Sequence, residues 1–146
     1  MSMSEIVPLL ELSIAPVIVI SGVGLVLLSM TNRYGRVIDR SRILADALRT
    51  AADADRPRFL EQQKIMLRRA RMLRLAITLE TLSLLLAAVL IITLFVSALF
   101  GFETVVLIAV LFVVCMSALI AGLLVFIVDV NISLSALRLE TGAEKH

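Results

Sequence analysis

The sequence predicts an all-α integral membrane protein with three transmembrane helices in a single membrane domain, residues 1–146. Hydrophobic residues make up 60% of the chain and the mean hydropathy is +1.05, whereas soluble domains are about 45–50% apolar. The excess falls in three blocks, at about 12–31, 75–100 and 104–128. A bilayer core about 30 Å thick needs about 20 helical residues at 1.5 Å each. Each block is therefore long enough to span a membrane.

The basic residues between the first two blocks predict the orientation. Segment 33–74 carries twelve Lys and Arg against five Asp and Glu, a net charge of +7, whereas the turn at 101–103 and the stretch before residue 12 carry no basic residue. Because Lys- and Arg-rich loops stay in the cytoplasm, we expect a multi-pass protein with its N-terminus outside, segment 33–74 inside and its C-terminus inside. The sequence pI near 9.2 then requires no nucleic acid, since this orientation and anionic lipid headgroups on the cytoplasmic side account for the charge.

Apolar residues inside segment 33–74 recur three or four residues apart, which is the helical period. The pattern stops at residues 53–57, where aspartate suits the N-cap of a following helix and proline its first turn. We therefore expect a cytoplasmic helical hairpin over 33–74 that extends the first two membrane helices. The alternative is a pair of flexible basic arms. The residues in period are Val37, Ser41, Leu44, Leu48 and Ala51 before the turn, and Phe59, Gln63, Met66, Ala70 and Leu73 after it.

A stripe of small and polar residues runs along the first helix. Its members follow one another in alternating steps of four and three residues, which places them on one helical face. Small residues on one face most often serve helix packing. The more specific interpretation is that several copies surround an axis with an acidic outer ring, an apolar constriction and a polar inner mouth. The predicted pore-lining residues are Glu11, Ala15, Ile18, Gly22, Leu25, Ser29, Asn32 and Arg36.

Two further residues of the first block bear on how its helix packs or bends. Pro16 removes one backbone hydrogen bond and is expected to kink or loosen the helix. Gly24 belongs to a neighbouring stripe of small residues that lets another helix approach closely. We therefore assign Pro16 and Gly24 to helix packing or to a hinge.

Four charged residues are expected at similar depth, near the cytoplasmic ends of the membrane helices. They are Glu80, Asp129, Arg33 and Arg74. Charged side chains at such depth are usually paired or functional. We predict an intramembrane charge clamp among the four, and a proton or cation site at the two carboxylates is the alternative.

The residue types that enzymes need are scarce in this chain. His146 is the single histidine and the last residue, so neither a Ser–His dyad nor a zinc site with histidine ligands is expected. Cys115 is the single cysteine and lies inside the third block, where it is expected to be a small packing residue. No glycine-rich phosphate-binding loop occurs in the sequence. We therefore expect no enzyme activity, no catalytic residue, no metal site and no cofactor.

Four motifs of the first helix carry a resemblance to a known family. They read Leu-Ser-Ile-Ala-Pro-Val at 12–17, Ser-Gly-Val-Gly at 21–24, Thr-Asn-Arg at 31–33 and Arg-Val-Ile-Asp-Arg-Ser-Arg at 36–42. On these residues the chain resembles the domain-of-unknown-function 2721 family of small bacterial inner-membrane proteins. The three-block layout extends the resemblance over nearly the whole chain. It implies a bacterial membrane protein of this topology and brings no established activity.

The predicted function follows from the first helix. Three helices can hardly enclose a pathway within one copy, and the first helix is too polar on one face for lipid, so we expect a homo-oligomer. We predict a channel-like protein that conducts ions along an axis lined by the first helix. The alternative is a non-conducting scaffold or regulatory subunit whose basic hairpin binds a cytoplasmic partner or anionic lipid.

The charge distribution makes the orientation testable. Single cysteines introduced as Asp53→Cys and Phe102→Cys should react with a membrane-impermeant thiol reagent from opposite sides of the membrane. Only Phe102→Cys should react in intact cells, because the +7 segment holds residue 53 inside. Labelling of both positions from outside would show the predicted orientation to be wrong.

Overall fold

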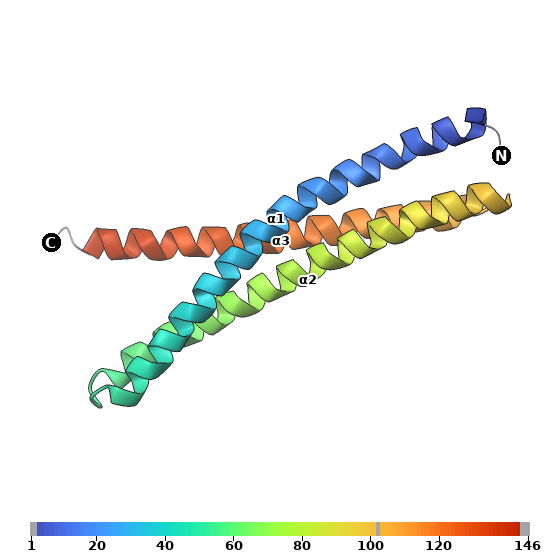
Figure 1. Ribbon diagram of the computed structural model, residues 1–146. Coiled ribbons are helices and arrows are strands. Elements are labelled where there is room, and N and C mark those ends of the chain that lie inside the picture. The colour runs from blue at the N-terminus through green and yellow to red at the C-terminus, as the bar shows by residue number, and fades with distance from the viewer. Residues whose placement is uncertain (1–2, 102, 144–146) are drawn as a thin grey trace.

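Three long α-helices make up the protein in a computed structural model that describes residues 3–101 and 103–143, with side chains placed for 6–8, 10–11, 14–101 and 103–133 (Figure 1). The helices are α1 (Met3–Thr50), α2 (Arg56–Phe100) and α3 (Val105–Ala143). The described residues contain no strand, and each helix includes a stretch long and apolar enough to cross a membrane. The predicted all-α class with three such helices is confirmed.

The turn between α1 and α2 covers only residues 51–55, because α1 continues to Thr50 after its apolar block and α2 begins at Arg56, well before its own. Pro8 and Pro16 lie inside α1 without ending it, so the loosening expected at Pro16 does not divide the helix. Asp55 occupies the N-cap of α2 and proline follows in the first turn. The Asp55 side chain makes no capping hydrogen bond. Its backbone carbonyl instead accepts from the Phe59 N–H at 3.3 Å.

The turn between α2 and α3 depends on Gly101. Its φ of 70° is a left-handed conformation, which glycine adopts at little cost. In this conformation the Gly101 N–H donates to the Ser97 carbonyl at 2.9 Å and ends α2. Thr104 then begins the return, with its hydroxyl donating to Ser97 Oγ at 2.6 Å and its carbonyl accepting from the Ile108 N–H at 3.0 Å. The two helices therefore reverse within four residues.

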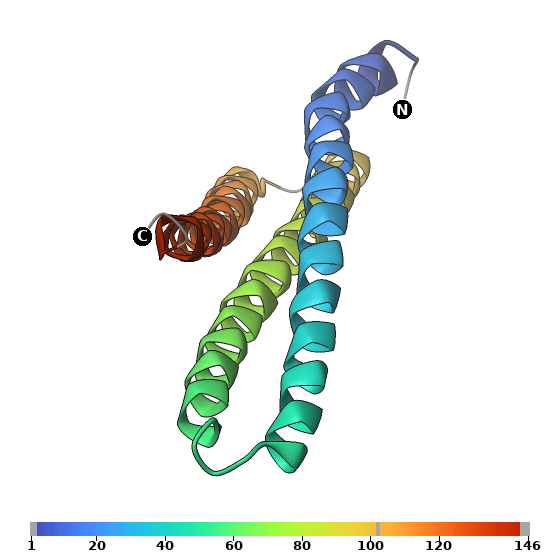
Figure 2. The same cartoon turned by 90° about the vertical axis from the view of Figure 1, so that its left-hand side faces the viewer.

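The helices cross rather than forming a parallel bundle. α2 packs against both other helices. The ribbons of α1 and α3 overlap near the middle of Figure 1, and α1 reaches α3 through Arg33, which contacts Asp129 and Phe126. Towards its N-terminus α1 leans away from the α2–α3 pair. Figure 2 shows α1 and α2 side by side along their hairpin, with the C-terminal half of α3 directed away from it. The N-terminal end of α1 and the α2–α3 turn lie at one end, and the hairpin lies at the other.

The buried core is a narrow seam of mostly small residues. Val23, Met30 and Val37 are buried at seven-residue intervals along α1, the repeat of a helix packed against a neighbour. α2 and α3 contribute small side chains that let backbones come close. Cys115 is one of them: it is buried, and its thiol donates to the Ser83 carbonyl at 3.2 Å. The buried residues of α2 are Ala70, Leu73, Ala76, Glu80, Ser83, Ala87 and Leu90.

One cluster holds the hairpin to the rest of the protein. Val37, Ala70 and Leu73 are buried together, and Met66 and Phe126 pack against them. The cluster therefore joins α1, α2 and α3. Its place relative to the two faces of the membrane stays a prediction.

The cluster predicts a cross-link within one chain. In a Cys115→Ala background, the pair Val37→Cys and Ala70→Cys should oxidise to an intrachain disulfide, because both side chains are buried in the same α1–α2 seam. Alkylation followed by intact-mass measurement would detect the bond. The control pair Val37→Cys and Leu75→Cys places its second thiol on an exposed face and should stay reduced. Equal oxidation of both pairs would argue for flexible arms.

Candidate functional site

The Asp129 carboxylate is the point at which side chains from all three helices meet. It is 0% exposed. Arg69 of α2 donates from Nε to Asp129 Oδ1 at 3.3 Å, and a terminal nitrogen of Arg33 on α1 lies 3.8 Å from Oδ2. The Arg33 guanidinium also lies over the Phe126 ring, 5.5 Å from its centroid, within the range of a cation–π contact. One buried negative charge is thus shared by two arginines from different helices.

The structure brings two of the four predicted clamp residues together and corrects the other two. Arg33 and Asp129 form an ion pair. Arg74 is exposed and borders a separate surface hollow, and Arg69 takes its place at Asp129. The reason is geometric: residues five apart lie about 140° apart around a helix, so both arginines cannot face α3. Arg69 lies three residues after Met66 and four before Leu73, which are core positions, and this spacing was the available signal.

Glu80 does not belong to the clamp either. Its side chain is 0% exposed, and neither carboxylate oxygen has a hydrogen-bond partner. No ion pair links it to any cation among the described residues. Gly122 of α3 makes room for it, because a Cβ at that position would lie 2.7 Å from Glu80 Oε1 and 3.2 Å from its Cγ. Glu80 lies on the same face of α2 as Arg69, since eleven residues make nearly three full turns, but it is about 16 Å further along the helix. It faces Gly122 rather than Asp129, so its position along α2, and not its side, separates it from the arginines.

Glu80 also borders an apolar groove of about 340 Å³ between the three helices. α1 contributes four of its lining residues and α3 contributes two. All of the side chains that accompany the carboxyl group are aliphatic. The lining residues are Val19, Gly22, Val23, Val26, Glu80, Leu119 and Leu123.

The predicted pore-lining stripe lies on the outer surface of the chain. Each of its eight members is exposed, with Ile18 at 66% and Leu25 at 73%. Gly24 of the neighbouring stripe is exposed as well, and nothing lies within 4 Å of where its Cβ would be. Pro16 is half-buried. The stripe is therefore on the outer surface, while two of its members border hollows between the helices: Gly22 lies beside the Glu80 groove, and Arg36 lines a second pocket with residues of α2 and α3.

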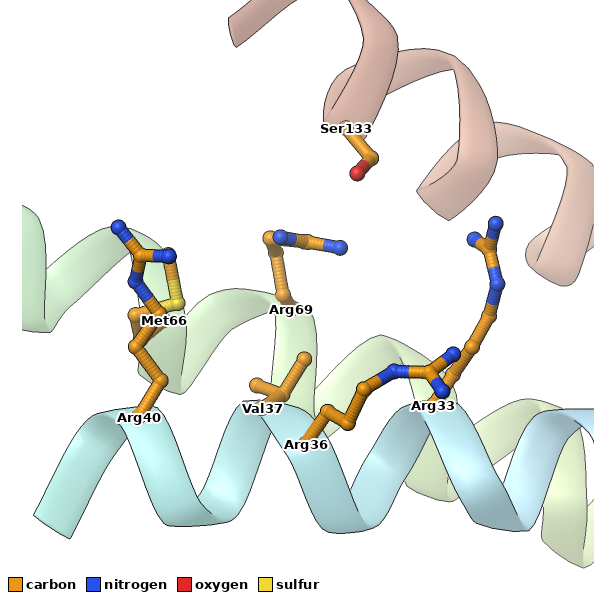
Figure 3. Close-up of a pocket in the computed structure, with 7 residues that line it drawn as sticks. All are labelled: Arg33, Arg36, Val37, Arg40, Met66, Arg69 and Ser133. Atoms are coloured by element: carbon orange, nitrogen blue, oxygen red, sulfur yellow. The ribbon is translucent and has the colours of Figure 1, made fainter. Parts of the chain in front are cut away.

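A pocket rich in arginine lies between the hairpin and α3, and sequence reasoning did not predict it. It has a volume of about 200 Å³. Figure 3 shows side chains from all three helices around it. One of them is Arg36, which the stripe assigned to the inner mouth of an axis. The lining residues are Arg33, Arg36, Val37, Arg40, Met66, Arg69 and Ser133.

Metal ligands do not gather in the part of the chain that the structure describes. No three His, Cys, Asp or Glu residues there come close enough to hold a metal ion. Of the two buried carboxylates, Asp129 pairs with Arg33 and Arg69, whereas neither oxygen of Glu80 has a hydrogen-bond partner.

Comparison with known proteins places the chain in a family. A family model described as "Protein of unknown function (DUF2721)" matches residues 13–139, which include the stripe from Ala15 onwards and the residues around Asp129 and Glu80. The chain belongs to this family. The resemblance noted at residues 12–42 is thereby confirmed. No curated protein and no solved structure matches the chain.

The two buried carboxylates of this DUF2721 chain should respond differently to neutralisation. Asp129→Asn should lower the free energy of unfolding by about 1.5–3 kcal/mol, because it weakens hydrogen bonds to charged groups and leaves Arg69 and Arg33 without a counter-charge. Glu80→Gln should cost less than about 1 kcal/mol, since neither oxygen has a partner to lose. Denaturant titration in mixed micelles, followed by circular dichroism, measures both. Similar losses for the two variants would contradict this assignment.

Proposed function

We propose that this DUF2721 protein is a homo-oligomeric, channel-like protein of the bacterial inner membrane that conducts ions along an axis lined by α1. One observation carries the proposal: the stripe of small and polar residues on α1 is exposed along its whole length. None of the eight residues is buried against α2 or α3, although Gly22 borders the groove beside Glu80 and Arg36 lines the arginine pocket. We therefore infer that the stripe makes a contact with something outside the protomer.

The surface of α1 differs from that of α3 in a way that supports assembly. The large exposed residues of α3, from Val105 to Val128, are Val, Leu, Ile and Phe, which suit lipid chains. The exposed face of α1 includes Gly22, Gly24 and Ser29. Small residues let helices approach closely and gain little from lipid contact. A second copy of the chain is the partner that we propose for this face.

The axis would present a different chemistry at each level. A ring of Glu11 carboxylates would concentrate cations at the outer mouth. Ile18 and Leu25 would form an apolar constriction that gates by excluding water. Asn32 and Arg36 would form the polar inner mouth. No single helix leaning away from its neighbours can enclose such a path, so the function requires several copies.

The alternative function is a non-conducting scaffold or regulatory subunit without enzyme activity. The observation that favours it is the length of the basic hairpin. Residues 33–50 of α1 continue the helix past the first apolar block, and eighteen residues at 1.5 Å each extend about 27 Å. With a net charge of +7 over 33–74, this projection suits an acidic cytoplasmic partner or anionic lipid.

Two substitutions in the stripe separate the channel from the scaffold. In liposomes, Leu25→Ser should raise ion leak several-fold, because a hydroxyl in an apolar constriction makes wetting easier. Glu11→Gln should lower cation flux relative to anion flux, because the outer ring loses its charge. The matched control is Leu124→Ser, which places the same change on an exposed position of α3 and should leave flux unchanged.

The Leu25→Ser variant decides the question, since a closed channel also gives a silent wild type. Native mass spectrometry or cross-linking in nanodiscs must first show that the variant assembles as the wild type does. An assembled but silent Leu25→Ser variant would contradict conduction and leave the scaffold. A wild type that is monomeric in nanodiscs would remove the axis altogether.

A further inference from the structure

The arginine pocket has more hydrogen-bond donors than the protein uses. Each guanidinium carries five N–H donors. Arg69 donates one of them to Asp129, and Arg33 lies 3.8 Å from the same carboxylate. Arg36 and Arg40 form no ion pair with any described carboxylate. Most of the donors around the pocket are therefore available to a ligand.

The charge around the pocket is also unbalanced. Four arginines line it, and Asp129 neutralises one of their charges, which leaves three. Asp39 of α1 borders a neighbouring hollow beside Arg36 and Arg40 but does not line this pocket. The polar groups of α3 that face these arginines are the Asp129 carboxylate and the Ser133 hydroxyl. The charged group of α2 that faces them is Arg69. Gathering like charges costs free energy that a bound anion would offset.

The side chains surround the space from several directions. Figure 3 shows Arg33 and Arg69 reaching from α1 and α2 towards α3, Arg36 lying along α1 towards Arg33, and the Ser133 hydroxyl directed into the gap from α3. Val37 and Met66 form its apolar floor. Planar guanidinium forks bind the oxygens of phosphate in pairs, and they do this better than lysine ammonium groups. A volume of about 200 Å³ exceeds that of several water molecules at about 30 Å³ each, enough for a phosphate group.

The depth of the pocket indicates where such a phosphate would come from. Three of its residues lie close to the ends of the apolar blocks: Arg33 is two residues after the first block, Arg69 six before the second, and Ser133 five after the third. This is the level of the lipid headgroups if the three blocks span the bilayer. Basic pockets between membrane helices at this level suit anionic headgroups.

We propose that this pocket binds a phosphate group, supplied by an anionic lipid headgroup or by a water-soluble phosphate compound. Arg36, Arg40, Arg33 and Arg69 donate to its oxygens, and the Ser133 hydroxyl adds one more donor. The inference deepens the lipid-binding alternative described above. It holds whether or not the protein conducts ions, because no step of it depends on an axis.

Binding of phosphatidylglycerol to the purified full-length protein tests the site. Native mass spectrometry in detergent should detect this lipid on the wild type, and Arg36→Gln with Arg40→Gln should weaken its binding about tenfold or more, as expected for the loss of charge-assisted hydrogen bonds. This pair leaves both partners of Asp129 in place. The matched control is Arg42→Gln with Arg49→Gln, which removes the same charge from α1 at two exposed positions that do not line the pocket. The control should bind like the wild type.

Competition identifies the source of the phosphate. Displacement of the lipid by inorganic phosphate or glycerol phosphate would assign the site to a soluble compound, and resistance to both would assign it to the headgroup. Equal weakening in the test and control pairs would overturn the proposal in favour of diffuse attraction, as would absence of binding by phosphatidylglycerol and by both soluble phosphates. Arg40→Gln alone, with a smaller loss, provides a second measurement if the double variant unfolds. Flux through the stripe variants is a separate readout, so failure of one experiment leaves the other standing.

Discussion

A single buried negative charge organises this protein. An ionised carboxylate in an apolar interior is costly unless it is paired and hydrogen-bonded. Asp129 is paired with one arginine from each of the other two helices. Its Oδ1 also accepts a hydrogen bond from Arg69, whereas its Oδ2 is held by charge pairing with Arg33 alone. α1 is joined to α3 where Arg33 pairs with Asp129 and lies over the Phe126 ring, and where Phe126 packs against the cluster of Val37, Ala70 and Leu73. On one side of these contacts α1 and α2 continue as a hairpin, and on the other side α1 leans away (Figure 1). The ion pairs of Asp129 with Arg33 and Arg69 therefore lie where the α1–α2 hairpin meets the part of the protein in which α1 leans away.

The sequence was sufficient for those features that depend on distance along the chain. Block length predicted three membrane-spanning helices, and the left-handed φ of Gly101 matches the tight turn expected there. Position along the helices predicted that Arg33 and Asp129 lie at the same level, and the two side chains form an ion pair. Rotation about the helix axis was harder to obtain, because α2 carries apolar residues on every side and no clear polar face marks its orientation. Rotation therefore separates Arg69, which faces Asp129, from Arg74, which is exposed. Glu80 faces the same way as Arg69 but contacts α3 at Gly122, about two turns before Asp129.

α1 has two surfaces with separate roles. Val23, Met30 and Val37 face the protomer and are buried, while the stripe that includes Leu25 and Asn32 faces outwards. Both surfaces have a repeat of about seven residues, so the periodicity of the sequence alone could not say which one is internal. The structure separates them, and it leaves the outward surface to be explained by lipid or by another copy. Glycine and serine on that surface favour another copy.

Arg36 connects the two proposals made for this protein. It is the last member of the exposed stripe, and it also lines the arginine pocket. In Figure 3 the Arg36 guanidinium lies along α1 towards Arg33. A phosphate bound in the pocket would offset its positive charge, which would otherwise oppose the passage of cations at the inner mouth of an α1-lined axis. An occupied pocket and a cation-conducting axis are therefore compatible.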